Sequence, residues 1–226
     1  MAGMRHWPLF GLRLRTPRLE LRLPGPRELD ELADTALEGV HAPDEMPFGA
    51  PWTLAPREEL GHRVVQWQWK TMAEWTPDDW SLSLAVVLDG RAIGIQDVRA
   101  RDFAVVREVA SGSWIGMRYQ GRGLGTEMRA AILELAFAGL GALTATTGAH
   151  TDNPSSLGVT RKLGYRPDGT TRAALLGRRV EDLRFVLDRD GWRKHRAIDV
   201  SIEGLEPCLH LFGATGDGGE EDGQSR

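Results

Sequence analysis

The segment Ser113–Thr126, SWIGMRYQGRGLGT, constrains the fold more than any other part of the chain. A strand-like stretch runs into Gly121, Gly123 and Gly125, and a helical pattern of apolar residues begins immediately afterwards. Such a turn exposes consecutive backbone N–H groups at the positive end of a helix, which suits an anion such as phosphate. Glycines let the backbone approach that anion closely, because a Cβ would be in the way. The sequence therefore predicts an α/β domain with a candidate phosphate-binding loop.

Three sequence motifs of phosphate-binding loops are candidates for this segment. A dinucleotide-binding fingerprint needs a third glycine where the chain has Thr126, and the strand after the helix should close on an acid but ends at 147–149, Thr-Gly-Ala. A P-loop needs Gly-Lys-Ser/Thr, which is absent. The pattern Gln/Arg-x-x-Gly-x-Gly/Ala is met by Gln120, Gly123 and Gly125. The alternative to all three is a glycine-rich turn that only ends a strand.

The charged residues and histidines indicate which kinds of partner the chain binds. Arg118 and Arg122 flank the glycines and are placed to add charge-assisted hydrogen bonds to an anion. Only three of the 28 basic residues are lysine, a bias that GC-rich coding sequence also produces. The net charge of −4 favours no nucleic-acid partner, and the six scattered histidines lack the i, i+4 spacing of a metal site. We expect neither a nucleic acid nor a metal.

Length and cysteine content suggest a cytoplasmic protein of one domain. The 226 residues leave room for one domain of generous size, which we place at 1–212, and the Gly/Asp/Glu-rich stretch 213–226 reads as a disordered acidic tail. Cys208 is the single cysteine, so no intrachain disulfide forms, as in a reducing compartment. The N-terminus lacks signal-peptide features, and no apolar run approaches the roughly 20 residues of a membrane span. A homo-oligomer is compatible with the sequence.

Hydrophobic periodicity gives the order of the elements. A period of two predicts strands, and a period near 3.6 predicts helices. The expected strands are 12–23 with an interruption at Thr16-Pro17, 81–88, 92–98, 105–117, 143–148 and two runs in 172–187, and the expected helices are 28–38, 56–75, 126–140 and 153–163. This order predicts the α/β class with a mixed sheet.

The glycine pattern resembles the pyrophosphate loop of the GNAT (GCN5-related) N-acyltransferases, which binds coenzyme A. Residues 16–22, TPRLELR, resemble the first strand of the RimJ/RimL-like branch of that family. Residues 153–165 resemble its Asn-x-x-Ser helix and the Gly-aromatic pair that follows. Together these likenesses span about residues 12–190 in the family's order. Stretches 6–10, 111–114 and 125–131 are also similar to a mycobacterial succinyl-CoA-binding member.

The resemblance implies a mixed, mostly antiparallel central sheet with helices on both faces and a splayed strand pair that holds acyl-CoA. Backbone groups of residues 114–117 would contact the thioester arm, and N–H groups of 121–126 would hold the pyrophosphate. Asn153 would contact the pantetheine or cap its helix, and Ser156 would protonate the departing sulfur. The expected cofactor contacts are Trp114, Ile115, Gly116, Met117, Arg118, Gln120, Gly121, Arg122, Gly123, Leu124, Gly125, Thr126, Asn153 and Ser156.

The catalytic base is the point at which the chain departs from the family. The family's usual glutamate, four residues before the tryptophan, is replaced here by Ala110. Glu108 lies on the same face of the strand and would act through a water, unless it is a solvated charge at the strand end. His150 is a second candidate base, unless it is structural. Ser156 is the candidate general acid, because Thr160 stands where many members of the family have a tyrosine that acts as the acid.

The implied activity is transfer of an acyl group from acyl-CoA to a primary amine by direct attack in a ternary complex. The donor would be acetyl-CoA by default, with succinyl-CoA a serious alternative. The acceptor would be a protein N-terminus, a lysine or a small molecule, covered by some of the tryptophans of residues 52–80, which core packing explains equally well. Because the usual glutamate is missing, a catalytically weak acyl-CoA-binding sensor or assembly module stays open.

Overall fold

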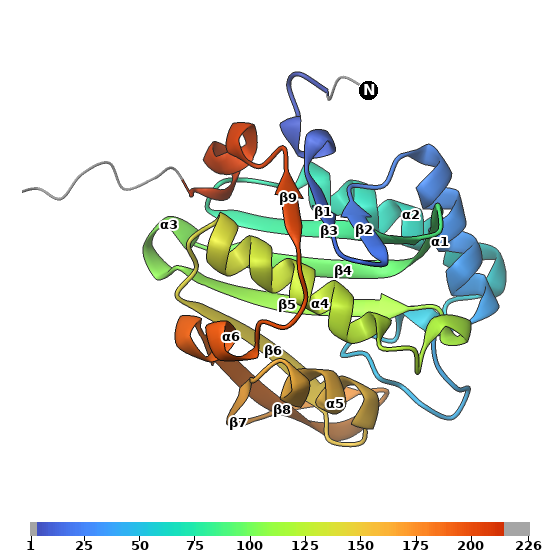
Figure 1. The fold of residues 1–226 in the computed structure, drawn as a ribbon. Coiled ribbons are helices and arrows are strands. Elements are labelled where there is room, and N and C mark those ends of the chain that lie inside the picture. Colours follow the sequence, from blue (N-terminus) through green and yellow to red (C-terminus); the bar gives the residue numbers. More distant parts are fainter. Residues whose placement is uncertain (1–3, 215–226) are drawn as a thin grey trace, which may run out of the picture.

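The computed structural model describes residues 4–214, which form a nine-stranded sheet with helices against it (Figure 1). The strand order is β7-β8-β6-β5-β4-β3-β2-β1-β9. All neighbouring strands are antiparallel except β5 and β6, which are parallel. This arrangement confirms the α/β class and the mixed, mostly antiparallel sheet.

The elements have the following bounds. The strands are β1 (Arg13–Arg15), β2 (Leu19–Arg22), β3 (Asp79–Leu88), β4 (Arg91–Arg101), β5 (Glu108–Ile115), β6 (Thr144–His150), β7 (Arg166–Leu175), β8 (Arg178–Asp188) and β9 (Ser201–Glu203). The helices are α1 (Pro26–Glu38), α2 (Arg57–Ala73), α3 (Phe103–Val106), α4 (Leu124–Glu134), α5 (Pro154–Lys162) and α6 (Arg189–His195). Short 3₁₀ turns lie at Pro8–Gly11, Trp52–Leu54, Met117–Tyr119 and Glu206–Phe212.

Helices cover both faces of the sheet, as the resemblance implied (Figure 1). Side chains along β3 alternate between two cores, because successive residues of a strand point to opposite faces. Leu84 and Val86 join a core with Met128 of α4, whereas Ala85 and Val87 join a second core with side chains of α1 and α2. We call these sides of the sheet the α4 face and the α2 face.

The N-terminal strand prediction was wrong in one respect. Residues 12–23 form two antiparallel strands, β1 and β2, paired from Arg13↔Arg22 to Arg15↔Glu20. The interruption at Thr16-Pro17 is the hairpin turn, closed by the Thr16 N–H donating to the carbonyl of Leu19. The leucines change from even positions before the turn to odd positions after it, but a bulge within one continuous strand would shift the alternation in the same way, so the pattern alone does not separate two strands from one.

The central hairpin follows its turn chemistry. β3 and β4 pair from Asp79↔Arg101 to Leu88↔Arg91, and the connecting Asp89 and Gly90 have φ of 49° and 81°. Positive φ at both positions is the mirror-image turn that matches the twist of paired strands, and Asp-Gly is a preferred sequence for it. The predicted hairpin is therefore confirmed.

Two predicted boundaries moved around β5 and α4. The strand expected over 105–117 begins at Glu108, because Phe103 is buried and residues 103–106 form the helical turn α3. The helix expected over 126–140 begins at Leu124, directly after the glycines, and residues 135–139 continue it with π-helical hydrogen bonding.

The C-terminal segment contains elements that periodicity did not predict. α6 follows β8, and β9 pairs antiparallel with β1 at the far edge of the sheet. The 3₁₀ turn Glu206–Phe212 then places backbone carbonyls of residues 211 and 212 against the indole N–H groups of Trp75 and Trp80. Ala214, assigned above to the tail, is buried, and the remainder of that stretch lies outside the described residues.

Candidate functional site

A cleft of about 650 Å³ opens where β5 and β6 separate. The parallel pairing ends at Ser111 and Thr147; beyond it, β5 continues to Ile115 beside β4 and β6 continues to His150 beside β8. The glycine loop, the start of α4, helix α5 and part of the loop at residues 40–49 line the rest of the cleft. The predicted splayed strand pair is thus present and forms the centre of the cavity.

The glycine loop presents free N–H groups to this cleft. Gly121 and Gly123 have φ of 72° and 77°, a left-handed conformation that residues with a Cβ seldom adopt. Gly123 is the N-cap of α4, and the N–H groups of residues 121–125 make no backbone hydrogen bond within residues 4–214. A helix N-terminus with unpaired N–H groups attracts an anion. The loop therefore has the geometry that phosphate binding requires.

The N-terminal hairpin holds this loop in place. Glu127, in the first turn of α4 and buried, accepts hydrogen bonds from Thr16 Oγ1 at 2.6 Å, the Arg18 N–H at 2.9 Å and Arg18 Nε at 2.6 Å. Arg18 Nη1 also donates to the carbonyl of Arg122 at 3.0 Å. On the other side, Gln120 Nε2 donates to the carbonyls of Val40 and Ile115. The loop is thus fixed from both sides before any ligand binds.

The two sides of the cleft differ because strand residues alternate in direction. Ser111 and Ser113 of β5 point to the α4 face, together with Thr147 of β6. Gly112 and Trp114 of β5 belong to the α2 face, where Trp114 packs against the second core. A ligand lying between the separated strands would therefore meet a different set of side chains on each face.

On the α2 face, His150 lies opposite Asp182. The two residues are cross-strand partners in the β6–β8 pairing, and Nδ1 of His150 approaches a carboxylate oxygen of Asp182. Both side chains line the cleft, and that of His150 is almost completely buried. The approach of Nδ1 to Asp182 is a close contact rather than a hydrogen bond, and Nε2 has no partner in the described part of the chain. A carboxylate at Nδ1 favours the proton there and leaves Nε2 free to accept one.

Helix α5 brings Asn153 and Ser156 to the cleft. Asn153 is the N-cap, and its Oδ1 accepts a hydrogen bond from the Ser156 N–H at 3.0 Å. The capping interpretation of Asn153 is therefore confirmed, and the residue also lines the cleft. Thr160, fully buried, donates its hydroxyl hydrogen to the Ser156 carbonyl at 2.9 Å.

A family model described as an acetyltransferase (GNAT) domain matches residues 18–166. The chain belongs to the GNAT acetyltransferase family. RimL, a ribosomal alpha-N-protein acetyltransferase in complex with coenzyme A, is 16% identical, with 78% of this chain and 97% of RimL covered and a TM-score of 0.61. Mycobacterium smegmatis RimJ, in complex with CoA-disulfide, is 16% identical, with 81% and 90% covered and a TM-score of 0.63. A GNAT from Brucella melitensis is 19% identical, with 81% of each chain covered and a TM-score of 0.62.

At these identities the solved structures show a shared GNAT fold, and the family match makes the chain an acyl-CoA-dependent N-acetyltransferase. The chain covers nearly the whole of RimL and RimJ, and RimL was solved with coenzyme A. Members of the RimJ/RimL branch are thus among the structures similar to this one.

Most of the residues expected at the GNAT cofactor site line the cleft, and some do not. Those that do are Trp114, Ile115, Gln120, Gly121, Gly123, Gly125, Thr126, Asn153, Ser156 and, among the catalytic candidates, His150. Gly116 and Leu124 are buried in packing, and Met117 and Arg122 are exposed outside the lining. Arg118 Nη1 pairs with Glu38 at 3.1 Å, and its guanidinium lies over the Tyr119 ring.

Glu108 lies at the opposite end of β5 from the glycine loop. Its carboxylate accepts the Thr144 hydroxyl hydrogen at 3.0 Å, and the side chain is exposed and absent from the cleft lining. Ser111 is three positions further along the strand, which is about 10 Å in an extended chain. This placement matches the interpretation of a solvated charge at a strand end.

Two buried charged residues near the GNAT cleft were not predicted from the sequence. Arg129 of α4 lines the cleft and pairs with no carboxylate of residues 4–214, and burial lowers the pKa of its guanidinium. Asp97 of β4 is the cross-strand partner of Gly112, and burial raises the pKa of its carboxyl to about 6. Sequence gave no signal for either, since Arg129 falls within a helical pattern and Asp97 within a strand pattern.

Aromatic side chains line the mouth of the cleft on the α2 face. Trp52 packs against Trp114 with ring centroids 5.6 Å apart, and Phe48 packs on Trp52 at 5.3 Å. Trp75 and Trp80 instead pack in the core with Phe212, and Trp67 and Trp69 are more than half exposed. Of the five tryptophans considered for an acceptor lid, only Trp52 therefore adjoins the cleft wall.

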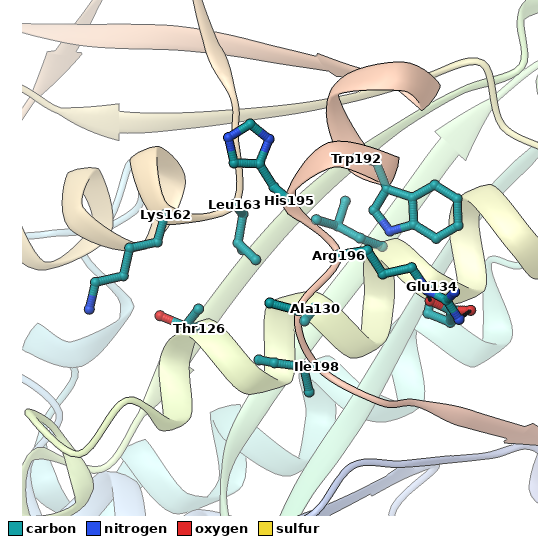
Figure 2. A pocket seen from close by; sticks show the side chains of 11 residues that line it. Thr126, Ala130, Glu134, Lys162, Leu163, Trp192, His195, Arg196 and Ile198 are labelled. Atoms are coloured by element: carbon teal, nitrogen blue, oxygen red, sulfur yellow. Dashed lines mark hydrogen bonds and ion pairs between the residues drawn. The ribbon is translucent and has the colours of Figure 1, made fainter.

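A second, smaller cavity of about 210 Å³ lies between α4, α5 and the segment after α6 (Figure 2). Figure 2 shows Glu134 and Arg196 facing each other at one side, where they form two hydrogen bonds of 2.8 Å. Thr126 and Lys162 line both this cavity and the cleft. The smaller cavity thus adjoins the first turn of α4, directly after the glycine loop.

Cys208, away from the cleft, is poorly suited to carrying an acyl group. Burial raises the pKa of the Cys208 thiol to about 11, so the thiolate needed for an acyl-carrying role is scarce at neutral pH.

No group of three or more potential metal-ligating side chains lies within residues 4–214. In the same part of the chain, no helix is both long enough and apolar enough to cross a bilayer.

Proposed function

We propose that the chain transfers an acyl group from acyl-CoA to a primary amine by direct attack in a ternary complex. The observation that carries this proposal is that the N–H-lined glycine loop and the gap between β5 and β6 open into one cleft. A single cavity can thus hold the phosphates at one end and the thioester at the other. Holding both reactants together supplies much of the rate acceleration in such a reaction.

The cofactor would bind largely through the backbone. The free N–H groups of residues 121–125 hold the pyrophosphate, and backbone groups of Trp114 and Ile115, which line the cleft, contact the arm as it enters the gap; the expected N–H groups of residues 116, 117 and 126 already donate to backbone carbonyls. Asn153 contacts the pantetheine through its amide nitrogen while its oxygen caps α5. The acyl group is acetyl by default, with succinyl as the finer alternative.

We propose His150 as the base. Its Nε2 accepts a proton from the attacking ammonium or amine, and Asp182 holds the ring in the required tautomer. The amine nitrogen then attacks the thioester carbonyl, and the tetrahedral intermediate collapses with cleavage of the C–S bond. The Ser156 hydroxyl donates its hydrogen to the departing sulfur, which leaves as the thiol, and its oxygen takes up the extra proton of the attacking nitrogen, so that the products are a neutral amide, free CoA and the imidazolium of His150. Glu108 is less suited, since it is exposed beyond the junction of the strands.

The acceptor enters from the α2 face, past the aromatic pair Trp52 and Trp114. Glu45 also lines this part of the cleft and would attract the positive charge of an amine before deprotonation. A protein N-terminus, a lysine and a small amine all meet these requirements. RimL acts on a ribosomal protein N-terminus, which favours a protein acceptor.

One observation supports a second function, that of an acyl-CoA-binding sensor or assembly module with weak catalysis. Ala110 has no acid–base group at the position where the family usually has its glutamate. Such a module would use the same loop and cleft without the turnover.

Thiol release from acetyl-CoA and succinyl-CoA, measured with a panel of amines, tests the proposed function. We expect amine-dependent release of free CoA in the wild type, and a Ser156→Ala enzyme with reduced kcat and unchanged donor affinity. Binding of donors without turnover for every amine would instead support the sensor or module. Unchanged kcat in Ser156→Ala would remove that hydroxyl from the mechanism.

A further inference from the structure

Arg99 of β4 lines the cleft without a counter-ion. Its side chain is exposed and forms no ion pair within residues 4–214. By contrast, Arg91 and Arg101 on the same strand each pair with a carboxylate. An arginine presents five N–H donors in a fixed planar arrangement that matches the two oxygens of a carboxylate. Arg99 is therefore available to bind an anion that enters the cleft.

The alanine at position 110 leaves this guanidinium unpaired. Ala110 is the cross-strand partner of Arg99, and it occupies the position where the family usually has its glutamate. Opposite charges directly across a pair of strands attract each other, so a glutamate there would pair with Arg99. Glu108, the next residue of β5 on that face, accepts the Thr144 hydroxyl hydrogen instead. The change to alanine thus leaves Arg99 free for a ligand.

Small residues leave room beside Arg99 on the α2 face. Arg99 shares this face with Ile95 of the second core, because both occupy alternate positions of β4. On β5 the same face carries Ala110 and Gly112, and a Cβ added at Gly112 would meet no atom within 4 Å. The surface between Arg99 and the gap that receives the thioester is therefore open to an acceptor.

Arg99 lies on the same face as His150 but further from the reacting amine. Ala110 pairs with Thr146 of β6, and His150 is four positions further along that strand. Arg99 and His150 are thus two strand spacings apart across the sheet, about 10 Å, and four residues apart along it, about 13 Å. His150 is almost completely buried with an unpartnered Nε2, so the amine end of the acceptor belongs there. A group held by Arg99 is then several bonds away from that amine.

The charges on this face change sign between the two ends of the acceptor path. Asp182 and Glu45 line the end that receives the amine and would attract an ammonium ion. Arg99 supplies a positive charge at the other end. Asp97 and Glu108 are on the same face as Arg99, so a carboxylate with one negative charge is more favourable there than a phosphate with two.

We propose that Arg99 binds a carboxylate of the acceptor, so that the enzyme prefers an amine that carries a carboxylate several bonds away. A peptide N-terminus with an acidic second residue has this chemistry, and so does a small ω-amino acid. This inference rests on the proposed function, since it assumes that the acceptor amine enters on the α2 face and reaches His150. It narrows the open choice of acceptor to one chemical class.

Steady-state release of CoA from acetyl-CoA with matched acceptors tests the proposal. The acceptors are three peptides that differ only in a second residue of glutamate, glutamine or lysine, together with γ-aminobutyrate and butylamine. Acetyl-CoA is the donor throughout, so no carboxylate comes from the acyl group. We expect kcat/KM to be about tenfold higher with a carboxylate than with its neutral counterpart, mainly through KM. The peptide pair and the small-amine pair distinguish the two sources of the carboxylate.

Variants of β4 and β5 separate a direct contact from a structural effect. Arg99→Gln should bring the glutamate and glutamine peptides to within about twofold of each other. Arg99→Glu should reverse the order and favour the lysine peptide, which loss of structure would not do. Ala110→Glu should weaken the preference while Arg99 is still present, because the new carboxylate competes for the guanidinium. Arg101→Gln, on the same strand and face but outside the cleft lining, should keep the wild-type preference.

Two kinds of result overturn the proposal. One is an equal kcat/KM of the wild type for acceptors with and without the carboxylate. The other is an Arg99→Gln enzyme that loses activity equally with all acceptors, or that binds acetyl-CoA more weakly in calorimetry, since Arg99 would then serve the donor.

Failure of the proposed function has a different signature. If no amine releases CoA, calorimetric titration of the three peptides into the CoA-loaded protein takes the place of kinetics. Tighter binding of the glutamate peptide that disappears in Arg99→Gln then supports the carboxylate site in a binding module. Absence of both turnover and peptide binding defeats the proposed function and this inference together. Turnover with every amine and no preference for a carboxylate defeats the inference alone.

Discussion

The glycine-loop wall of the cleft and its β6 wall are built from different parts of the chain. The loop presents backbone N–H groups and is held by Glu127, Arg18 and Gln120 through hydrogen bonds formed within the protein. The β6 wall instead presents His150 together with its partner Asp182. A backbone surface depends on local conformation, whereas the second wall depends on two strands meeting in one register. We therefore expect donor binding and catalysis to respond to different mutations.

The largest expected effect is on turnover. His150→Gln should lower kcat by at least about 100-fold, because the base is lost, and leave donor affinity within about twofold. Steady-state kinetics and calorimetry check the two quantities separately. Asp182→Asn should lower kcat less, because the base is kept and only the carboxylate beside its imidazole is lost. If His150→Gln retains full kcat and Glu108→Gln loses it, the assignment of the base is wrong.

The next effect concerns the support of the loop. Glu127→Gln should lower the free energy of unfolding by about 2 kcal/mol, since a buried carboxylate that accepts several hydrogen bonds is replaced by a neutral amide. Denaturant unfolding measures it, and donor affinity should fall in parallel. The matched control is Glu181→Gln, whose exposed pair with Arg172 contributes little. Equal losses in both variants would contradict the role given to Glu127.

The pH dependence of folding stability tests the α2 face independently of the glycine loop. Burial raises the pKa of Asp97 to about 6 from 3.8, so the folded protein binds the proton more tightly than the unfolded chain. Stability should therefore fall as pH rises from about 4 to about 6 and carry a constant penalty above that range. Asp97→Asn should remove the penalty and stabilise the protein at pH 7 by about 1–2 kcal/mol.

Unfolding curves at pH 4.5 and pH 7 check this prediction. The exposed Asp30→Asn variant serves as a control, because it should leave the pH dependence unchanged. A wild type whose stability does not change between these pH values would show that Asp97 is not held in an unfavourable charged state. Donor affinity should remain constant throughout, since the glycine loop has no titrating side chain.

The smallest expected effect is on the loop itself. Gly123→Ala forces a Cβ into a left-handed conformation with φ of 77°, which costs about 1–2 kcal/mol. We expect acyl-CoA affinity to fall about tenfold with kcat unchanged at saturating donor. Gly61→Ala, in the second turn of α2, is the control, because its Cβ would meet Ala33 at an ordinary 3.5 Å. A Gly123→Ala protein with wild-type affinity would show that the loop does not depend on this conformation.

The same contrast explains what the sequence could predict. Gly121, Gly123 and Gly125 were recognisable because a backbone site needs particular residue types at fixed spacing. The His150–Asp182 pair was not, since the two residues are 32 positions apart and meet only through the β6–β8 register. Arg129 was hidden for a related reason, because its contacts come from another strand and another helix. Long-range proximity of this kind leaves no periodic signal in one sequence.

Secondary structure followed the same rule. The Asp89-Gly90 hairpin and the helices α1, α2 and α5 were predicted because their turns, caps and apolar spacing are local. β9 was missed because three residues are too few for a pattern and their strand character comes from pairing with β1. The split of residues 12–23 into two strands likewise depends on the pairing of Leu14 with Leu21, not on their order in the chain.

The pairing of β9 with β1 has a consequence for synthesis on the ribosome. The first strand of the sheet leaves the exit tunnel early, but its outer edge stays open until residues 201–203 have been made. The indole N–H groups of Trp75 and Trp80 likewise lack their acceptors, the carbonyls of residues 211 and 212, until the C-terminal segment has been made. An open strand edge and an uncovered aromatic cluster are features that chaperones bind and that lead to aggregation. Nascent chains of this protein therefore complete their fold only once the C-terminal segment has emerged.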